Sequence, residues 1–580
     1  MIENEIPRGT RTPLYRAFEM LPAVVSYSLL VLVFVLPFID PRLGAYYVLA
    51  VVGVMFFRAI RGSVDLARGF ARFRASSRVD WSARLVDIGL ALDGRRVPPS
   101  PPHSFRVHRH RALLDEVKAD PDRFLHPNDL RHAVIVAAYN EPYDVIAPTI
   151  RSLAYSTTPG EQLLVFFAYE ERGGDGIRET AHRLRAEYGH RFGAFEIVEH
   201  PTDLPDEIAG KGSNITYAGH AVSRWVKEHG IAPEHVLVTT LDCDNHPYDS
   251  YFDYVAYEYI ASPDRKRTAY QPISLYITNI WDAPAVTRVI ASANCFWNLT
   301  CTVRPFALRN FASHSQPLDA LEEMGYWSKR TIVEDGHQYW RSYFHFRGNY
   351  RVVPIHVPIY QDAVMAGGLK DTLVAQFTQL SRWSYGASDV PFVAAGIFGR
   401  HRRAPFWAGF LRFLNLLEGH ISLACVSLII AMGGWIPFLV MRTTGGSDAF
   451  IEQMPYVVGL VQQIAMISLL ISILVYRAVL PPRPVYYSRR RHLFMYLQWL
   501  LYPATILTFN ASTALYSQGR LLVGRYRERF DVTEKMTAAS AGVPGAAAVA
   551  LDAPTSAAWI GRGHARPSDR GSTVEHSRER

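Results

Sequence analysis

The chain has few cysteines for its length, and their placement excludes two classes of protein. Four cysteines occur among 580 residues, and none of them form a C-x-x-C pair: they stand at positions 243, 295, 301 and 425. This pattern encodes neither a disulfide framework nor a cysteine-based metal cluster. A reducing, cytoplasmic environment therefore suits the soluble part of the chain.

The sequence also lacks an internal repeat and a cleavable secretion signal. The first apolar run, residues 21–39, has no A-x-A cleavage site and is followed by a second run at residues 45–60. Each run approaches the roughly 20 residues that cross a bilayer, so we expect a transmembrane hairpin; a hairpin buried in a soluble core is the alternative. Arginines on both flanks put both of its ends in the cytoplasm.

The positive charge is not arranged for nucleic acid. The formal net charge is +8, but the basic residues gather beside apolar runs and do not alternate with aromatic residues along a groove. We therefore expect the lipid bilayer, with its anionic headgroups, as a partner and no nucleic acid. The expected location is the plasma (inner) membrane, crossed several times, with the soluble domain on the cytoplasmic side.

Composition divides the chain into six parts. We expect a cytoplasmic N-terminus, a transmembrane hairpin, a cytoplasmic linker, a soluble domain, an interface helix followed by further spans, and a disordered cytoplasmic tail, at residues 1–20, 21–60, 61–130, 131–400, 401–530 and 531–580.

The C-terminal apolar runs pose a problem of topology. An interface helix is expected at residues 404–417, and spans near residues 421–440, 457–480 and 493–515. Three spans would put the basic residues after position 520 outside, against the positive-inside rule. Either residues 404–440 contain another crossing, or the last span is a broken hairpin at Pro503.

Strands and helices alternate along the soluble domain. Apolar runs at residues 133–138, 163–168, 195–198 and 236–241 are expected strands, with amphipathic helices between them. Alternation with connections of this length predicts a parallel, right-handed, Rossmann-like α/β sheet. Ligands of such sheets bind at the carboxyl ends of the strands.

Two aspartates follow the strand that begins at Val236. Asp242 and Asp244 stand one residue apart at its carboxyl end. Removing both charges from water is costly unless a positive group joins them, and a divalent cation carrying a diphosphate is a suitable partner. A capped loop is the structural alternative.

Polar groups also follow the other strands. Asn140 and Glu141 come after the first strand, where a nucleotide base can lie, and Glu170 follows the second. Lys211 stands in a turn of small residues that opens a helix, a setting suited to an anionic ligand. A satisfied turn and a surface lysine are the structural alternatives.

Two more groups of polar residues lie downstream. Glu334 and Asp335 form a carboxylate pair after a short apolar stretch. Further on, Arg382 offers several N–H donors that can bind phosphate. It is flanked by the Gln379 amide and by Trp383, whose indole can stack on a sugar ring. Helix capping and a core tryptophan are the alternatives.

These groups together resemble a known family. Asn140-Glu141, Asp242-x-Asp244, Glu334-Asp335 and Gln379-x-x-Arg382-Trp383, enclosed by apolar runs, resemble the membrane-integrated family 2 glycosyltransferases, which include cellulose, chitin and hyaluronan synthases. The resemblance covers about residues 20–520. It implies a cytoplasmic GT-A domain inserted between N-terminal and C-terminal transmembrane helices. It also implies an inverting hexosyltransferase that moves a sugar from a nucleoside-diphosphate donor to a growing polysaccharide. UDP is the expected nucleotide, and the enzyme would export its product.

The resemblance also implies roles for single residues. Asp242 would contact the nucleotide, and Asp244 would bind Mg²⁺ or Mn²⁺ on the diphosphate. Asp335 would be the general base that takes the proton of the acceptor hydroxyl. The remaining groups would hold the diphosphate leaving group and the acceptor: Arg382 for the former, Gln379 and Trp383 for the latter.

Other readings stay open. Where the family carries an Asp-rich turn this chain has Glu170 and Glu171, and residues 311–316 replace a glycine-rich acceptor loop. The first alternative is a non-processive transferase whose acceptor is a lipid-linked sugar, that is, a glycolipid. A non-catalytic membrane scaffold or a transporter is the second, although no expected span carries the mid-membrane carboxylate of an ion pathway.

Overall fold

A mixed eight-stranded sheet forms the centre of the soluble domain. The computed structural model describes residues 5–7, 9–400 and 402–530, so the tail expected at residues 531–580 lies outside it. The strand order is β3-β2-β1-β4-β7-β6-β8-β5. The strands are β1 Arg131–Ala138, β2 Leu163–Glu170, β3 Ala194–His200, β4 Val236–Asp242, β5 His246–Pro247, β6 Thr268–Tyr276, β7 His314–Pro317 and β8 Arg351–Gln361.

The four predicted strands are present and parallel, but the sheet as a whole is not. β1 pairs with β2 and β4, and β2 pairs with β3, all in parallel. β7 then inserts antiparallel to β4 and β6, while β8 runs parallel to β6. The prediction of an all-parallel sheet was wrong because β7, with the sequence His-Ser-Gln-Pro, has no apolar pattern that marks it as a strand.

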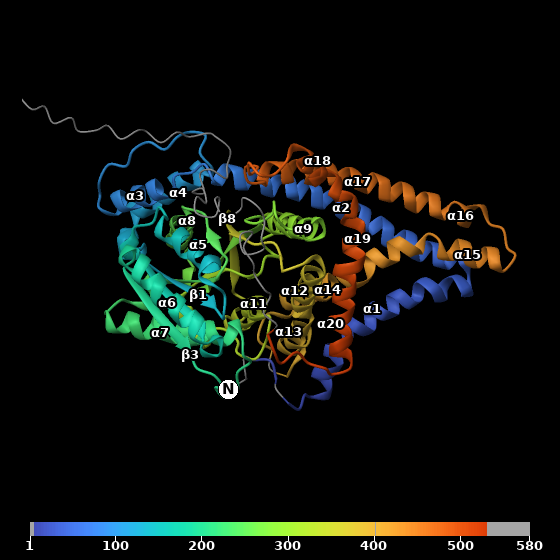
Figure 1. Cartoon of the computed structure of the whole chain (residues 1–580), viewed down its shortest axis with the longest axis horizontal. Coiled ribbons are helices and arrows are strands. Elements are labelled where there is room, and N and C mark those ends of the chain that lie inside the picture. The colour runs from blue at the N-terminus through green and yellow to red at the C-terminus, as the bar shows by residue number, and fades with distance from the viewer. Residues whose placement is uncertain (1–4, 8, 401, 531–580) are drawn as a thin grey trace, which may run out of the picture.

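Helices cover both faces of the sheet (Figure 1). Side chains alternate along β1, so that Val134 and Val136 join one core cluster and Ala133 and Ile135 join the other. The first cluster packs under α5 (Tyr143–Ala154), α6 (Asp175–Tyr188) and α8 (Tyr251–Ile260), and the second under α7 (Lys211–Glu228) and α10 (Leu318–Met324).

The region expected as a linker, residues 61–130, contributes to this core. Helices α3 (Trp81–Leu92) and α4 (Val107–Ala119) pack against α8, and the Trp81 ring stacks on Tyr254 with 3.6 Å between centroids. The indole is almost fully buried, with 1% of its surface exposed. This segment is therefore anchored on the domain over much of its length.

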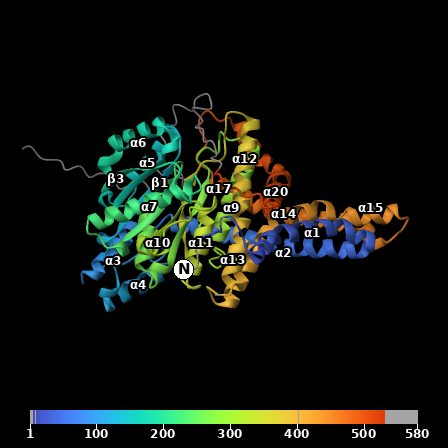
Figure 2. The same cartoon turned by 90° about the horizontal axis from the view of Figure 1, so that it is seen from below.

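Within the described residues, four helical segments are long and apolar enough to cross a membrane. They are α1 (Pro13–Ile39), α2 (Pro41–Ser76), α14 (Phe406–Gly433) and the stretch Ala449–Val479, which contains α16 (Ala449–Glu452) and α17 (Met454–Val479). α1 and α2 form the expected hairpin, and Asp40 at their junction caps α2 by accepting the Arg42 N–H at 2.9 Å. Figures 1 and 2 show α1, α2 and α14 running away from the sheet on one side, together with α15 (Ile436–Thr443).

Two details of the C-terminal region differ from expectation. Residues 404–417 do not form a separate interface helix, because most of them belong to the continuous helix α14. Residues 493–515 do not form one span: α18 (Arg489–Leu497), α19 (Tyr502–Thr505) and α20 (Ser512–Leu522) are separated by 3₁₀ and π turns around Pro503. A proline lacks the N–H of a regular helical hydrogen bond, which accounts for the change of helix type next to Pro503.

Candidate functional site

The carboxyl ends of β1 and β2 are joined by an aromatic and ionic contact. Arg172 donates to both carboxylate oxygens of Glu170, at 2.6 and 3.1 Å, and its guanidinium lies 4.4 Å from the centroid of the Tyr139 ring. Glu141 accepts the Tyr139 N–H at 2.8 Å, whereas Asn140 is exposed. Glu170 is thus engaged with a neighbouring arginine at the edge where a nucleotide was expected.

Lys211 connects carboxylates of two separate elements. Its Nζ lies 2.6 Å from Oδ1 of Asp242, at the end of β4, and 3.9 Å from Oε1 of Glu334, in α11 (Glu334–His345). Burial alone would lower the pKa of Lys211, but the negative charges of these carboxylates outweigh it and raise the pKa. The ammonium therefore stays protonated between them.

The close approach of α7 to α11 depends on Gly212. A Cβ at this position would lie 2.5 Å from the Ser328 carbonyl oxygen and 3.1 Å from the Glu334 Cβ. Any side chain there would push the first turn of α7 away from α11 and separate Lys211 from Glu334. The small residues of the Gly210–Ser213 turn are thus explained by packing.

The first turn of α11 carries the acidic pair. Glu334 is 4% exposed, and burial, followed by repulsion from Asp335, raises the pKa of Glu334 to about 7. Asp335 accepts the Ala312 N–H at 2.6 Å and the Gly336 N–H at 2.7 Å. These two donors fix the orientation of the Asp335 carboxylate.

Tyr276, at the end of β6, lies within the electrostatic influence of the acidic groups. Burial is the main reason that its pKa is raised, and the charges of Asp242, Asp335 and Asp244 contribute as well. Asp244 is 5% exposed and accepts the Asp362 N–H at 3.4 Å, next to the end of β8. The charges of the aspartates that follow β4 and of Asp335 in α11 therefore act on the same phenol.

Helix α12 (Leu369–Ser384) completes the arrangement. The Trp383 ring lies 5.9 Å from the Tyr276 ring between centroids and is 37% exposed. The Arg382 guanidinium lies 4.2 Å from the centroid of the Phe530 ring, and Phe530 in turn packs against Gly210, next to Lys211. Gln379, one turn earlier, accepts a hydrogen bond from Gln376 at 3.2 Å.

Most of the residues singled out in the sequence thus share one region, and the end of β1 lies beside it, since Ala137 pairs with Asp242. The shared region contains Lys211, Asp242, Asp244, Glu334, Asp335, Arg382 and Trp383. Sequence reasoning missed Tyr276, Asp362 and Phe530. An aromatic residue at the end of a strand gives some signal for Tyr276, but β6 itself was not predicted.

Asp242 and Asp244 could hold a divalent cation only if substrate phosphates supply further ligands. Among residues 5–7, 9–400 and 402–530, no three histidine, cysteine or acidic side chains are grouped so that they could hold a metal alone. Mg²⁺ is commonly bound by one or two carboxylates plus substrate phosphates. Asp242 and Asp244 match this donor set, since both are carboxylates at the edge that carries Lys211.

Comparison with known proteins gives a distant structural likeness. No family profile and no curated protein matches the chain. The mannosyltransferase PcManGT from Pyrobaculum calidifontis, in complex with GDP-Man and Mn²⁺, is 16% identical over 73% of this chain and 98% of its own, with a TM-score of 0.35. S. aureus TarS 1–349 in complex with UDP-GlcNAc is 11% identical over 70% of this chain and 95% of its own, with a TM-score of 0.32. These TM-scores are too low for either likeness to carry an argument about this chain.

Proposed function

We propose that the chain is an inverting, metal-dependent glycosyltransferase that moves a sugar from a nucleoside diphosphate, UDP in the first instance, to a growing polysaccharide. The observation that carries this proposal is the position of the Lys211 ammonium, 2.6 Å from Asp242 and 3.9 Å from Glu334, which brings the carboxylates of β4 and α11 into one region. Such a site combines cations for a leaving diphosphate with carboxylates for a metal ion and for proton transfer.

The donor end of the site would be built around β4 and α7. Asp242 would contact the nucleotide, and Asp244 would hold Mg²⁺ or Mn²⁺ with the diphosphate, whose charge the metal ion offsets when bound. Lys211, now 2.6 Å from Asp242, and Arg382 offer an ammonium and a guanidinium to the same diphosphate. As the bond from the sugar to the diphosphate breaks, these two cations stabilise the negative charge that develops on the leaving group.

The acceptor end would lie between α11 and α12. Asp335 is held by the N–H groups of Ala312 and Gly336, so its carboxylate is ready to take the proton of an acceptor hydroxyl as the new glycosidic bond forms. Trp383 and Tyr276 offer aromatic faces on which a sugar ring can stack, and the Gln379 amide can bind a hydroxyl. Attack from the face opposite the leaving diphosphate inverts the anomeric carbon.

The membrane arrangement supports a location at a bilayer. Four crossings by α1, α2, α14 and the Ala449–Val479 segment return the chain to the side on which it began. The basic residues after position 520 would then lie with the sheet domain in the cytoplasm, as the positive-inside rule requires. We place the chain in the plasma (inner) membrane and expect the product to be exported through it.

A second candidate is a transferase that makes a single addition to a lipid-linked acceptor. It is favoured by the number of candidate spans, four within the described residues, which is few for a wide polysaccharide channel. Labelled donor followed by sizing of the product separates the two: a ladder or a high polymer supports the first function, and one added sugar supports the second.

The activity itself is tested with a donor panel. Purified chain in nanodiscs is incubated with UDP- and GDP-sugars and Mg²⁺, Mn²⁺ or a chelator, and release of nucleoside diphosphate is measured. We expect metal-dependent release from one donor class and its loss in Asp335→Asn. Intact donors after prolonged incubation across the whole panel would favour a non-catalytic scaffold or a transporter.

A further inference from the structure

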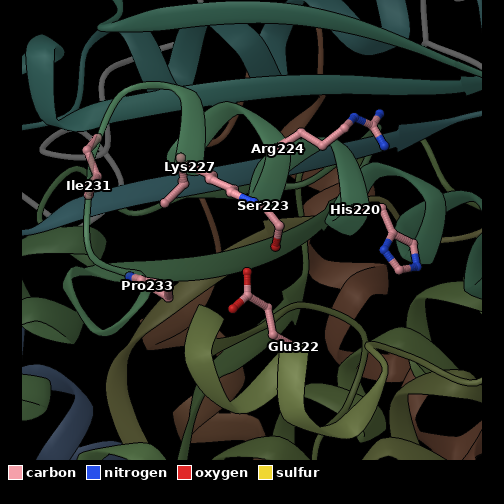
Figure 3. Close-up of a pocket in the computed structure, with 8 residues that line it drawn as sticks. His220, Ser223, Arg224, Lys227, Ile231, Pro233 and Glu322 are labelled. Carbon is pink, nitrogen blue, oxygen red and sulfur yellow. The ribbon is translucent and has the colours of Figure 1, made fainter.

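A separate cavity lies between α7 and α10, on the far part of α7 from Lys211. It encloses about 470 Å³, and its polar lining comes from His220, Ser223, Arg224 and Lys227 of α7 and Glu322 of α10. Figure 3 shows Glu322 pointing from α10 toward Ser223. A volume of this size lies within the range of about 300–1,000 Å³ typical of small-molecule sites.

The cavity carries an excess of positive charge. Positions 220, 223, 224 and 227 follow the helical spacing that puts side chains on one face. Arg224 and Lys227 are exposed, and neither has an ion-pair partner within the described part of the chain. Burial lowers the pKa of His220, and the charges of Lys329 and Arg224 lower it further.

One wall of the cavity is held by a residue in an unfavourable backbone conformation. Tyr326 has φ +59°, a left-handed value that is costly for a bulky residue, and its hydroxyl lies 2.6 Å from the Ser223 Oγ. Its ring packs edge-on against His220, 4.3 Å between centroids. A Cβ on Gly219 would lie 2.6 Å from this ring, so a glycine is needed here. Strain of this kind is often kept at binding sites.

We infer that this cavity binds a small phosphorylated sugar. Arg224 and Lys227 provide the donors that a phosphate group requires. Glu322 and Ser223 can bind sugar hydroxyls, and Ile231 and Pro233 give an apolar surface for the ring face. The single carboxylate among the cations argues for a ligand that has hydroxyl groups as well as a phosphate.

The cavity is distinct from the candidate site. Residues 220–227 lie 9 to 16 positions after Lys211 on the same helix, or roughly 14–24 Å at 1.5 Å per residue. A ligand of the size of a sugar phosphate cannot span both. Binding here does not depend on the proposed function, so the two can fail separately.

Calorimetric titration of the whole chain in nanodiscs, without divalent metal, tests the inference. The probes are glucose 6-phosphate and inorganic phosphate. We expect saturable binding of glucose 6-phosphate that weakens about tenfold for each cation removed in Arg224→Gln and Lys227→Gln. Glu322→Gln should weaken glucose 6-phosphate several-fold and leave inorganic phosphate unchanged or bound more tightly.

Two controls make the result specific. Lys118→Gln with Arg185→Gln removes two exposed cations from other helices, and Arg382→Ala removes a cation of the candidate site; both should retain the affinity. Absence of saturable binding would overturn the inference. So would an affinity that is unchanged by the double substitution Arg224→Gln/Lys227→Gln, or one that is lost only in Arg382→Ala.

Discussion

Asp335 is the residue on which turnover is expected to depend. In Asp335→Asn the side chain keeps its shape but can no longer take a proton from the acceptor. We expect the rate to fall about 10²–10⁴-fold, with donor affinity unchanged. Single-turnover release of nucleoside diphosphate and calorimetric donor binding measure the two quantities.

Asp319→Asn is the matched control for this substitution. Asp319 is an aspartate paired with Lys266, at 3.6 Å, and belongs to α10. Its variant should keep the wild-type rate. A normal rate in Asp335→Asn would assign proton transfer to another group.

Glu334 gives a prediction about stability and pH. Its pKa is raised from 4.5 to about 7 by burial and then by Asp335. The folded chain binds this proton more tightly than the unfolded chain, so the contribution to the free energy of unfolding is full below pH 4.5 and is lost as the pH rises to about 7. Each unit of pKa shift corresponds to about 1.4 kcal/mol.

Glu334→Gln removes this titration. As the pH rises from about 4.5 to 7, the wild type loses this contribution and the variant does not. The difference in melting temperature, variant minus wild type, should therefore become more positive over this range. Glu116→Gln, on an exposed position of α4, should show no such trend. Parallel curves for wild type and Glu334→Gln would mean that Glu334 is already ionised when buried.

Part of the site could be foreseen from single residues, and part could not. Asp242 and Asp244 follow an apolar β-branched run, so their place at a sheet edge is encoded locally. Tyr276 and Phe530 carry no such local signal. They reach the site only because β6 lies two strands from β4 and because residues after α20 pack on Gly210. The roles of the site residues stay a prediction until the variants are measured.

At the scale of elements, the packing of α2 on α9 (Ala285–Cys301) requires a glycine. A Cβ on Gly69 would overlap the carbonyl oxygen of Leu299, which belongs to the backbone and cannot rotate away. Gly69→Ala should therefore lower stability by about 1–3 kcal/mol, seen as a lower melting temperature.

Gly62, on the same helix, provides the control. No atom lies within 4 Å of its added Cβ. Gly62→Ala should be neutral, or stabilising by up to about 1 kcal/mol through helix propensity. Equal melting temperatures for the two variants would show that α2 and α9 are not in tight contact in solution.

The elements themselves were predictable where a pattern repeats over several residues. The four parallel strands and the α1–α2 hairpin have such patterns, and their positions were confirmed. β7 is short and polar, so it has no apolar run that marks a strand. β8 is rich in Val and Ile, but Pro354 and Pro358 interrupt its pattern, and a proline argues against a central strand. The continuity of α14 was missed because aromatic residues near position 407 suggested a surface helix.

At the scale of the whole molecule, four crossings predict which loops face each side. All four cysteines are buried, so single added cysteines can be labelled without background. Ser447→Cys, between α15 and α16, should react with an impermeant maleimide in intact cells. Arg95→Cys, between α3 and α4, should react only after permeabilisation. If the impermeant maleimide labels Ser447→Cys and Arg95→Cys equally in intact cells, the four-crossing arrangement is excluded.

Helix α2 is longer than the hydrocarbon layer of a bilayer is thick. Its 36 residues span roughly 54 Å, against about 30 Å for a bilayer core. The C-terminal half of α2 rests on α9, whose Cys295 accepts the Tyr276 N–H at 3.1 Å. Lipids with shorter or longer acyl chains would change the tilt of α2 and, through α9, the position of the Tyr276 phenol in the candidate site. Turnover should therefore vary with acyl-chain length in nanodiscs, and the variation should be smaller once Gly69→Ala has loosened the contact with α9.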